Sequence, residues 1–394
     1  MRAARLSIAY VHYGTQSGVT PAVTRALLDR GHDIRLVGAT GVLEPRDPVT
    51  RRLRPTPEVA LHLAASALRF GRSAITHRWN TCYAFDQHTR AAEEALAAIR
   101  PEPDLVLQNG ALFSPGLPPR GPYALLLDHT RALAEASPAW PSAGLARPRE
   151  YGRGWFARES ALYRGAVMLA CFSENVARSL VRDYAVDPGH VAVVGAGANV
   201  FPERAPRRDD GRTLVFVGKD FARKGGPILL DAFARVRRAF PKARLIVAGA
   251  PAPGGGTPPG VFFLGRVTMG EVAALLSQAT VFALPTLREP FGIAFLDAMA
   301  CGVPCVGTRV EAVPEIVRDG ETGLLVPPGD PASLALALER LLGDPVLARA
   351  MGARGRAWVF AGGLWSHVAA RLERALTTAF SQPVRAEESC LGAR

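Results

Sequence analysis

Two acidic residues in the C-terminal half have the spacing of a ligand-binding pair. Glu289 immediately precedes an expected helix, and Asp297 follows eight residues later, inside that helix. A separation of two helical turns puts the carboxylates roughly 10 Å apart or more, too far to share one proton. They can instead accept hydrogen bonds from hydroxyl groups on either side of a phosphate. The alternative is a helix-dipole acid and an incidental surface acid, but the apolar neighbours Phe295 and Leu296 favour binding at Asp297.

The helix that carries Asp297 also offers an anion site at its N-terminus. A short apolar run predicts a strand that ends at Leu284, and the helix pattern opens near Phe291. The free N–H groups of Gly292 and Ile293 would then face the carboxyl edge of that strand, where the helix dipole adds positive potential. This arrangement predicts a site for a diphosphate.

A second segment concentrates lysine. The chain has 47 Lys plus Arg, of which only Lys219, Lys224 and Lys242 are lysines. Two of these three flank Arg223 in the loop 218–226, directly before another expected helix. Lysine binds phosphate as a compact point charge. An exposed basic loop is the alternative, but this clustering against a background of arginine favours phosphate binding.

Short apolar runs that read as buried strands alternate with helical patterns along the chain. In the first half the expected strands are 6–11, 33–37, 105–107, 123–127, 167–172 and 191–194, with a helix over 19–29. In the second half they are 214–217, 244–248, 261–264, 281–284 and 304–307, with helices over 227–240, over 269–279 and from 291. The alternation predicts an α/β protein of two Rossmann-like halves with a cleft between them.

A polar, proline-containing stretch over 201–211 separates the two series and reads as a linker. The expected domains are residues 1–204 and residues 205–365. Residues 366–394 are expected to form a helix that crosses back to the first domain, followed by a tail.

Composition excludes several classes of protein. With 394 residues, 48% hydrophobic and 21% charged, the chain is neither disordered nor collagen-like nor a disulfide-stapled miniature. The net charge of +12 suits an anionic partner, but it divides evenly: residues 1–204 hold 24 cations and 18 anions, and residues 205–394 hold 23 and 17. The charge alone therefore identifies no partner.

The cysteine and histidine spacing points to a reduced, metal-free protein. The cysteines lack paired spacing and are expected to be free thiols: Cys82, Cys171, Cys301, Cys305 and Cys390. No zinc-type cluster and no Asp-x-Asp pair occurs, so no metal is expected. No apolar run reaches the length of a membrane span, and the N-terminal run is too short for a signal peptide. A cytoplasmic protein is expected.

One stretch, residues 51–79, is strongly basic. It carries a single acid, Glu58, and six arginines: Arg51, Arg52, Arg54, Arg69, Arg72 and Arg78. Leucines are interleaved with them, as in an amphipathic helix. A solvated helix packed on the sheet is one interpretation, and peripheral contact with an acidic membrane surface is the other.

Taken together, the motifs resemble those of the retaining glycosyltransferases of family 4, which have the GT-B fold. The matching segments are Gly218–Gly225, Glu289–Gly292 with Asp297 behind it, Pro314–Val317 and Asp319–Val326. The resemblance extends over essentially all of residues 1–380. It implies two facing Rossmann-like domains with the donor in the second.

The resemblance also implies roles for individual residues of the second half. These are Lys219, Arg223 and Lys224 at the donor diphosphate, Glu289 at the sugar hydroxyls, the backbone of Phe291, Gly292 and Ile293 at phosphate and sugar, Asp297 at the ribose, and Arg266 with Val267 near the base. In the first half it implies that the turn Ser17–Gly18 approaches the diphosphate. It also implies that His129 lies near the sugar and the acceptor. Glu289, Lys224 and His129 are the expected catalytic residues.

Three positions depart from the family pattern. Asp297 stands where glutamate is usual, so the ribose contact would be one methylene shorter. Lys219 replaces a common arginine, which turns a bidentate phosphate contact into a point charge. Glu311–Ala312 occupies a turn that is often Gly-Gly, so an acid is expected to change the pocket there.

The implied reaction is transfer of a sugar, of hexosyltransferase class, from a nucleotide diphosphate sugar to a hydroxyl or amine of a glycan, lipid or small metabolite, with retention at the anomeric carbon. No dedicated nucleophile is evident, so a same-face displacement is expected. Two alternatives stay open: a nucleotide-sugar 2-epimerase of the same architecture, and a basic nucleic-acid-binding protein, for which no recognition motif is present.

Overall fold

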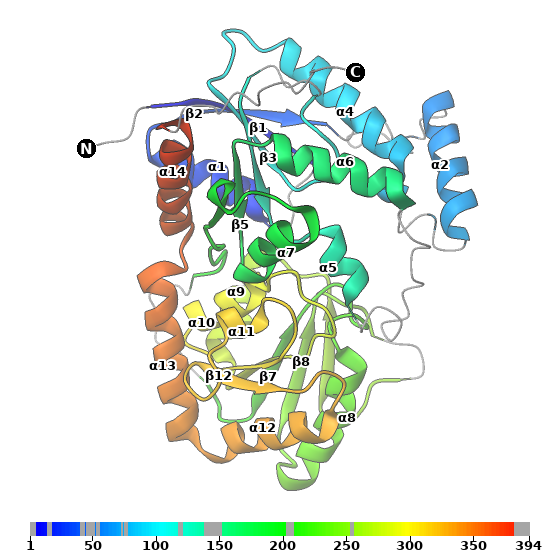
Figure 1. The fold of residues 1–394 in the computed structure, drawn as a ribbon. Coiled ribbons are helices and arrows are strands. Elements are labelled where there is room, and N and C mark those ends of the chain that lie inside the picture. The colour runs from blue at the N-terminus through cyan, green and yellow to red at the C-terminus, as the bar shows by residue number, and fades with distance from the viewer. Residues whose placement is uncertain are drawn as a thin grey trace, which may run out of the picture.

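The computed structural model describes residues 5–13, 18–39, 44, 52, 56–71, 74, 78–116, 121–137, 152–201, 209–252 and 256–381. They form two six-stranded sheets whose strands are all parallel, with helices packed on the faces (Figure 1). The strand orders are β2-β1-β3-β4-β5-β6 and β12-β11-β10-β7-β8-β9. The expectation of an α/β protein with two Rossmann-like halves is confirmed.

The strands coincide with the apolar runs of the sequence, because helices on both faces bury both sides of each central strand. The first sheet contains β1 Ser7–His12, β2 Asp33–Gly38, β3 Leu105–Asn109, β4 Tyr123–Leu127, β5 Met168–Cys171 and β6 Val191–Val193. The second contains β7 Thr213–Val217, β8 Arg244–Ala248, β9 Val261–Gly265, β10 Val281–Leu284, β11 Cys305–Thr308 and β12 Gly323–Val326. The sequence analysis assigns Gly323–Val326 only to a motif and does not predict β12.

Helices of the first half mostly begin at a hydroxyl side chain. They are α1 Val19–Asp29, α2 Pro57–Phe70, η4 Arg78–Asn80, α4 Cys82–Ala97, α5 Arg131–Ala136, α6 Gly152–Gly165, α7 Glu174–Tyr184 and η5 Pro188–His190. The residues Thr56, Thr81, Thr130 and Ser173 precede α2, α4, α5 and α7, and each accepts a hydrogen bond from the N–H three residues further on. Such caps satisfy N–H groups that the helix itself cannot.

Helices of the second half follow the expected pattern with one shift. They are α8 Gly226–Ala239, α9 Met269–Gln278, α10 Ile293–Ala300, α11 Val313–Ile316, α12 Pro331–Gly343, α13 Pro345–Gly362 and α14 Trp365–Ser381. Helix α10 begins at Ile293 and not at Phe291, because Gly292 has a φ of 109°, outside the helical region. Across the described residues, no helix is long and apolar enough to cross a membrane.

The last helix, α14, returns to the first half and packs against α1 (Figure 1). Glu373 of α14 is buried and binds two residues at the end of α1 and the start of β2. Arg30 Nε donates to the Glu373 carboxylate at 2.8 Å, and His32 Nε2 lies 3.3 Å from its other oxygen. The C-terminal helix is therefore held to the N-terminal sheet by a partly buried charge cluster.

Glu373→Ala should lower the free energy of unfolding by about 1–3 kcal/mol, because the substitution leaves Arg30 and buried His32 without their acceptor. Glu373→Gln, which keeps an acceptor oxygen, should lower it less. Urea denaturation monitored by circular dichroism measures both.

Asp29→Ala is the matched control on α1. Its ion pair with Arg25 is exposed, with 58% and 78% of the two side chains accessible, so the loss should stay below about 0.5 kcal/mol. Equal effects of Glu373→Ala and Asp29→Ala would contradict a stabilising role for the cluster.

Candidate active site

The loop between β7 and α8 lies directly against the end of β10. Gly225 has a φ of 76°, and a Cβ added there would stand 1.8 Å from the carbonyl oxygen of Pro285. Only glycine allows this approach. It brings the neighbouring residue, Lys224, to Glu289, and the Lys224 ammonium donates a hydrogen bond to the Glu289 carboxylate.

The Lys224–Glu289 pair is largely removed from solvent. Only 14% of the Lys224 side chain and 6% of the Glu289 side chain are accessible. Burial lowers the pKa of Lys224, while the charge of Glu289 opposes that effect. Lys219, at the start of the same loop, is exposed. The two lysines predicted to bind phosphate therefore differ: Lys224 is largely buried and paired with Glu289, whereas Lys219 faces solvent.

Arg223 ties the two loops of the site together. Its Nη1 donates to the carbonyl oxygen of Arg288 at 2.8 Å, and its Nε donates to Asp220 at 3.2 Å. In return, the Leu287 N–H donates to the Arg223 carbonyl at 2.9 Å. These bonds position the segment before α10, a role that the sequence analysis missed. Its contact with the donor diphosphate stays a prediction.

The N-terminus of α10 is open. No side chain caps it, and its N-cap Gly292 holds a φ of 109°. A Cβ at Gly292 would meet the Phe295 ring at 2.9 Å and the Glu289 side chain at 3.2 Å. Phe291 is buried edge-on against Phe172 of the first half, with ring centroids 5.5 Å apart. The first N–H groups of α10 thus lie beside Glu289, as the anion-site prediction requires.

Asp297 makes a contact that the sequence does not suggest. Its Oδ1 accepts hydrogen bonds from the N–H of Asn199 at 2.6 Å and of Val200 at 3.0 Å, in the segment that leaves the first sheet. Burial raises the pKa of Asp297 from its ordinary value of 3.8 to about 7, although both N–H donors oppose the shift. In this structure Asp297 binds the connection between the halves. The ribose contact stays a prediction.

The same connection is held from two further sides. Gly18 has a φ of 88°, and an added Cβ would lie 2.9 Å from the Asn199 amide nitrogen. The indole Nε1 of Trp365 donates to Asn199 Oδ1 at 2.9 Å. Gly18 therefore packs on the interdomain connection, next to the cleft, while Ser17 lies outside the described residues.

His129 reaches the site from the first half. It follows β4 and has 12% of its side chain accessible; its Nε2 lies 3.9 Å from Glu311 Oε1 of the second half. Burial, reinforced by the nearby positive charge of Arg288, holds the pKa of His129 well below its usual range. The imidazole is thus neutral at physiological pH and offers one hydrogen-bond donor and one acceptor.

Asp128 is a residue of the site that the sequence analysis did not single out. Its carboxyl group interacts electrostatically with Arg288 and Glu289 across the cleft. Its signal was its position, directly after β4 and before His129, since the carboxyl ends of parallel strands gather at one edge of a sheet.

The loops after β7, β8 and β9 lie side by side. The Gly249 N–H donates to the Gly265 carbonyl at 2.7 Å, and a Cβ at Gly249 would stand 2.9 Å from the Gly218 carbonyl. Arg266 is exposed and Val267 is half-buried at this edge. The structure thus brings these two positions to the same sheet edge as the lysine loop, and their base contact stays a prediction.

A cavity of about 700 Å³ lies between the halves and borders Glu311. Its walls are mostly apolar and come from both halves: Leu133, Ala136, Ser137, Asn175, Ala222, Pro227, Ile228, Leu287, Arg309, Val310, Glu311, Pro328 and Gly329. It lies on the side of Glu311 formed by α5, α7 and the loops after β11 and β12. The cavity therefore adjoins the site where the motif residues gather.

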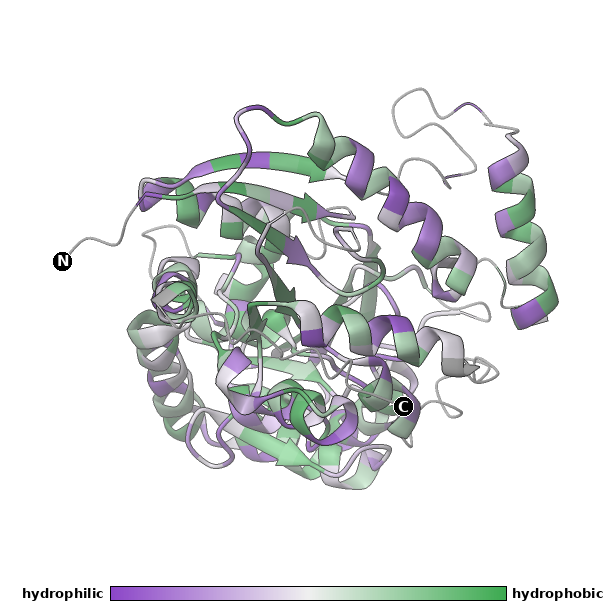
Figure 2. Ribbon diagram, turned by 45° about the horizontal axis from the view of Figure 1, so that its top comes forward, coloured by the Kyte–Doolittle hydropathy of each residue, from purple (hydrophilic) through white to green (hydrophobic). Residues whose placement is uncertain are grey.

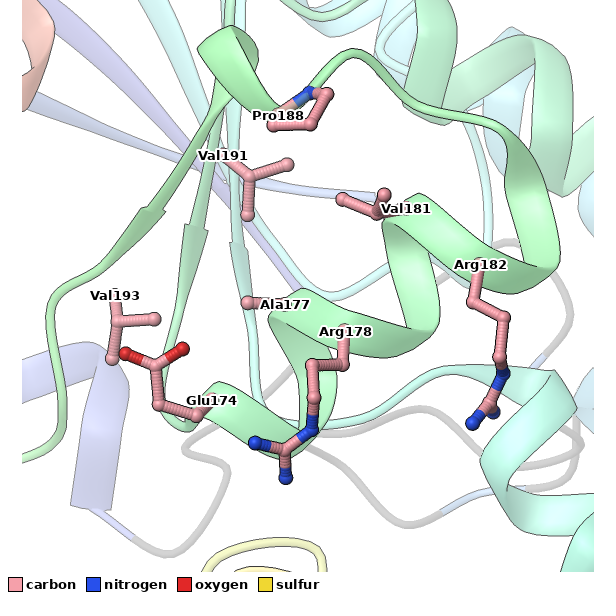
Figure 3. Close-up of a pocket in the computed structure, with 8 residues that line it drawn as sticks. All are labelled: Glu174, Ala177, Arg178, Val181, Arg182, Pro188, Val191 and Val193. Atoms are coloured by element: carbon pink, nitrogen blue, oxygen red, sulfur yellow. The ribbon is translucent and has the colours of Figure 1, made fainter.

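A second hollow runs along α7 and the edge strand β6 of the first half, and Figure 3 shows its lining side chains. None of the sequence-predicted site residues lines it. One end is fixed by Glu315, whose carboxylate accepts hydrogen bonds from the N–H of Glu174 at 2.8 Å and of Asn175 at 2.9 Å. Glu315, predicted only as part of a motif, thus caps α7 from the other half.

The raised pKa of Asp297 predicts a pH-dependent stability. A carboxyl pKa above its unfolded value stabilises the fold fully below that unfolded value, and the contribution disappears as pH rises through about 7. Asp297→Asn should therefore gain stability relative to the native protein between pH 5 and pH 8, at about 1.4 kcal/mol per unit of pKa shift. Melting temperatures of both proteins at the two pH values measure this gain.

Asp183→Asn is the control. The Asp183 carboxylate pairs with Arg182, and the hydrogen bond from Arg182 lowers its pKa. Its stability difference from the native protein should not change between pH 5 and pH 8, because a carboxyl whose pKa is lowered from 3.8 is ionised throughout that range. A difference between Asp297→Asn and the native protein that does not vary with pH would contradict the assignment.

Comparison with known proteins agrees with this geometry. Residues 211–344 match the family described as "Glycosyl transferases group 1". The phosphatidyl-myo-inositol mannosyltransferase of Mycobacterium leprae is 38% identical over 43% of this chain and 47% of its own length. The MMP alpha-(1->4)-mannosyltransferase of Mycolicibacterium hassiacum is 29% identical over 94% and 96%. The chain spans about half the length of the first relatives it matches.

Solved structures share the whole two-domain fold. The sucrose-phosphate synthase of Thermosynechococcus elongatus superposes with a TM-score of 0.70 at 20% identity, covering 95% of this chain and 99% of its own. WaaG, a glycosyltransferase involved in lipopolysaccharide biosynthesis, superposes with a TM-score of 0.66 at 16% identity, covering 94% and 99%. The chain therefore has the two-domain GT-B fold of these structures, and its residues 211–344 match the glycosyl transferase group 1 family.

Proposed function

We propose that this chain is a retaining glycosyltransferase that moves a sugar from a nucleotide diphosphate sugar to an acceptor hydroxyl or amine. The observation that carries the proposal is the buried Lys224–Glu289 pair beside the open N-terminus of α10, with His129 facing it from the other half. The fold neighbour HepE of Anabaena, with a TM-score of 0.61 and 14% identity, has been solved with UDP and glucose. Neither the epimerase nor the nucleic-acid alternative has support in the comparisons.

The proposed mechanism stabilises the leaving diphosphate with protein groups. Lys219, Lys224 and the first N–H groups of α10 would hold the charge that develops as the sugar–phosphate bond breaks. Glu289 would orient the sugar through its hydroxyls. In a same-face displacement the leaving phosphate oxygen takes the proton of the acceptor, so the protein supplies no nucleophile. The proposal includes no metal cofactor.

Lys224→Ala and Glu289→Ala should each lower kcat about 100-fold or more, since each removes a group that acts on the departing diphosphate or the sugar in the transition state. The measurement is release of nucleotide diphosphate with a panel of nucleotide sugars and candidate acceptors, with EDTA present because no metal is proposed. Lys242→Ala is the control: that lysine is exposed and outside the site.

Unchanged kcat in both site variants would refute the assignment. A native protein that binds no nucleotide sugar, seen as no rise in melting temperature, would refute it independently.

We also propose that the acceptor is reached at an acidic membrane surface, through α2. The exposed side of α2 carries small apolar residues, the acid Glu58 in the first turn, and two leucines, Leu61 and Leu68, of which 60% and 89% are accessible. This helix lies at the edge of the molecule in both views (Figures 1 and 2). Arg69 lies in the last turn of α2, whereas Arg51, Arg54 and Arg72 lie outside the described residues. An apolar face with an arginine beside it suits an anionic lipid surface.

The double variant Leu61→Glu/Leu68→Glu should reduce binding to vesicles of anionic phospholipid about tenfold or more, because it removes two apolar side chains and adds like charge. Cosedimentation measures the bound fraction. Leu336→Glu on α12, where the leucine is 67% accessible, is the matched control and should bind as the native protein does. Equal binding of the double variant and the control would contradict the proposal.

A further inference from the structure

Glu311 is a half-buried acid at the turn after β11, and its backbone is strained. Its φ is 44°, in the left-handed region that favours glycine. In this conformation the Cβ of a residue other than glycine crowds its own backbone, which is sterically unfavourable. The side chain is held there nonetheless, with only 12% of it accessible.

The Glu311 carboxylate is anchored by one oxygen and open at the other. Oε2 accepts a hydrogen bond from the N–H of Glu289. Oε1 has no hydrogen-bond partner among the described residues, although Arg288 Nε lies 3.6 Å away. Both ring nitrogens of His129 likewise lack a hydrogen-bond partner in the described part of the chain. Two buried polar atoms, Glu311 Oε1 and His129 Nε2, therefore face one small region of the cleft, and each requires a partner.

The distance between them admits one oxygen atom. Glu311 Oε1 and His129 Nε2 are 3.9 Å apart, and an oxygen about 2.8 Å from each makes ordinary hydrogen bonds to both. Burial raises the pKa of Glu311, while the positive charge of Arg288 opposes the shift. In its ionised form the carboxylate only accepts hydrogen bonds, so the bridging group must bring a proton. A phosphate or carboxylate oxygen carries none and would be repelled.

We propose that Glu311 binds a hydroxyl group of the sugar being transferred and thereby contributes to the choice of donor. The inference rests on the proposed function. Because Oε2 is bonded to the backbone of Glu289, the open oxygen lies within the sugar-binding region, while the diphosphate would lie at Lys219 and α10. A hydroxyl between Glu311 and His129 would hydrogen-bond to Oε1 of the second half and to Nε2 of the first half. The sugar itself would then bridge the cleft.

The test compares affinities by calorimetry for the native protein, Glu311→Gly and Glu311→Gln. Glycine accepts the φ of 44° and removes the carboxylate. Glutamine keeps an oxygen for the Glu289 N–H. The ligands are the nucleotide sugar that most raises the native melting temperature, its nucleotide diphosphate alone, and its monodeoxy analogues. No acceptor is present.

Glu311→Gly should lower the affinity for the nucleotide sugar about tenfold or more, because it removes a hydrogen bond to a charged group. It should change the affinity for the nucleotide diphosphate less than about twofold. Glu311→Gln should have an affinity for the nucleotide sugar between those of the native protein and Glu311→Gly. One monodeoxy analogue should bind the native protein and Glu311→Gly equally, because it lacks the hydroxyl group that Glu311 would bind.

Equal weakening of nucleotide sugar and nucleotide diphosphate would overturn the proposal in favour of a purely structural role. Unchanged affinity for both would overturn it as well, and would be the result if Glu311 touches only the acceptor. Native protein that binds neither ligand would instead refute the proposed function, and the inference with it.

Discussion

The arrangement of the two halves depends on one buried carboxylate. Asp297 Oδ1 accepts hydrogen bonds from two consecutive N–H groups, those of Asn199 and Val200, in the segment that leaves the first sheet. Buried N–H groups without partners cost free energy, so these bonds hold the connection against α10 of the second half. Trp365 and Gly18 hold Asn199 from other sides. Because Asp297 lies on α10, these hydrogen bonds also position the N-terminus of α10 relative to the first sheet.

The apolar core extends this constraint across the cleft. One hydrophobic cluster contains buried residues of both sheets, and Phe172 joins the halves by packing against Phe291 and Trp365. Glu373 and Glu315 add charged or capping contacts at two further places. Because these contacts surround the cleft, His129 can approach Glu311 and Arg288 although it belongs to the other half.

The cleft brings two kinds of polar group side by side, and the Lys224–Glu289 pair joins them. Cationic and N–H donors collect at the lysine loop and at α10, where a diphosphate fits. Acids and a neutral imidazole collect at Glu289, Glu311 and His129, where hydroxyl groups fit. A nucleotide diphosphate sugar carries both kinds of group in this order, which is why the two regions together favour that class of donor.

The sequence by itself determined the fold class and placed the second-half motif residues at turns of the sheet, while their binding roles stay predictions. Buried strands of parallel sheets read as continuous apolar runs, and the lysines and acids stand at turns whose positions follow from those runs, so local pattern was enough. It did not predict β12, and it placed the start of α10 two residues early, because the left-handed φ of Gly292 delays the helix.

Only the tertiary structure decided which distant groups meet. The sequence predicts that Asp297 binds a ligand from within a helix. In the structure its carboxylate accepts a hydrogen bond from the backbone N–H of Asn199, 98 positions away. Arg223 reads as a phosphate cation, yet it ties two loops together. Glu311 reads as a bulky substitution, yet it faces His129 of the other half. Hydrogen bonds to backbone N–H and C=O groups leave no trace in residue type, because every residue except proline offers both groups.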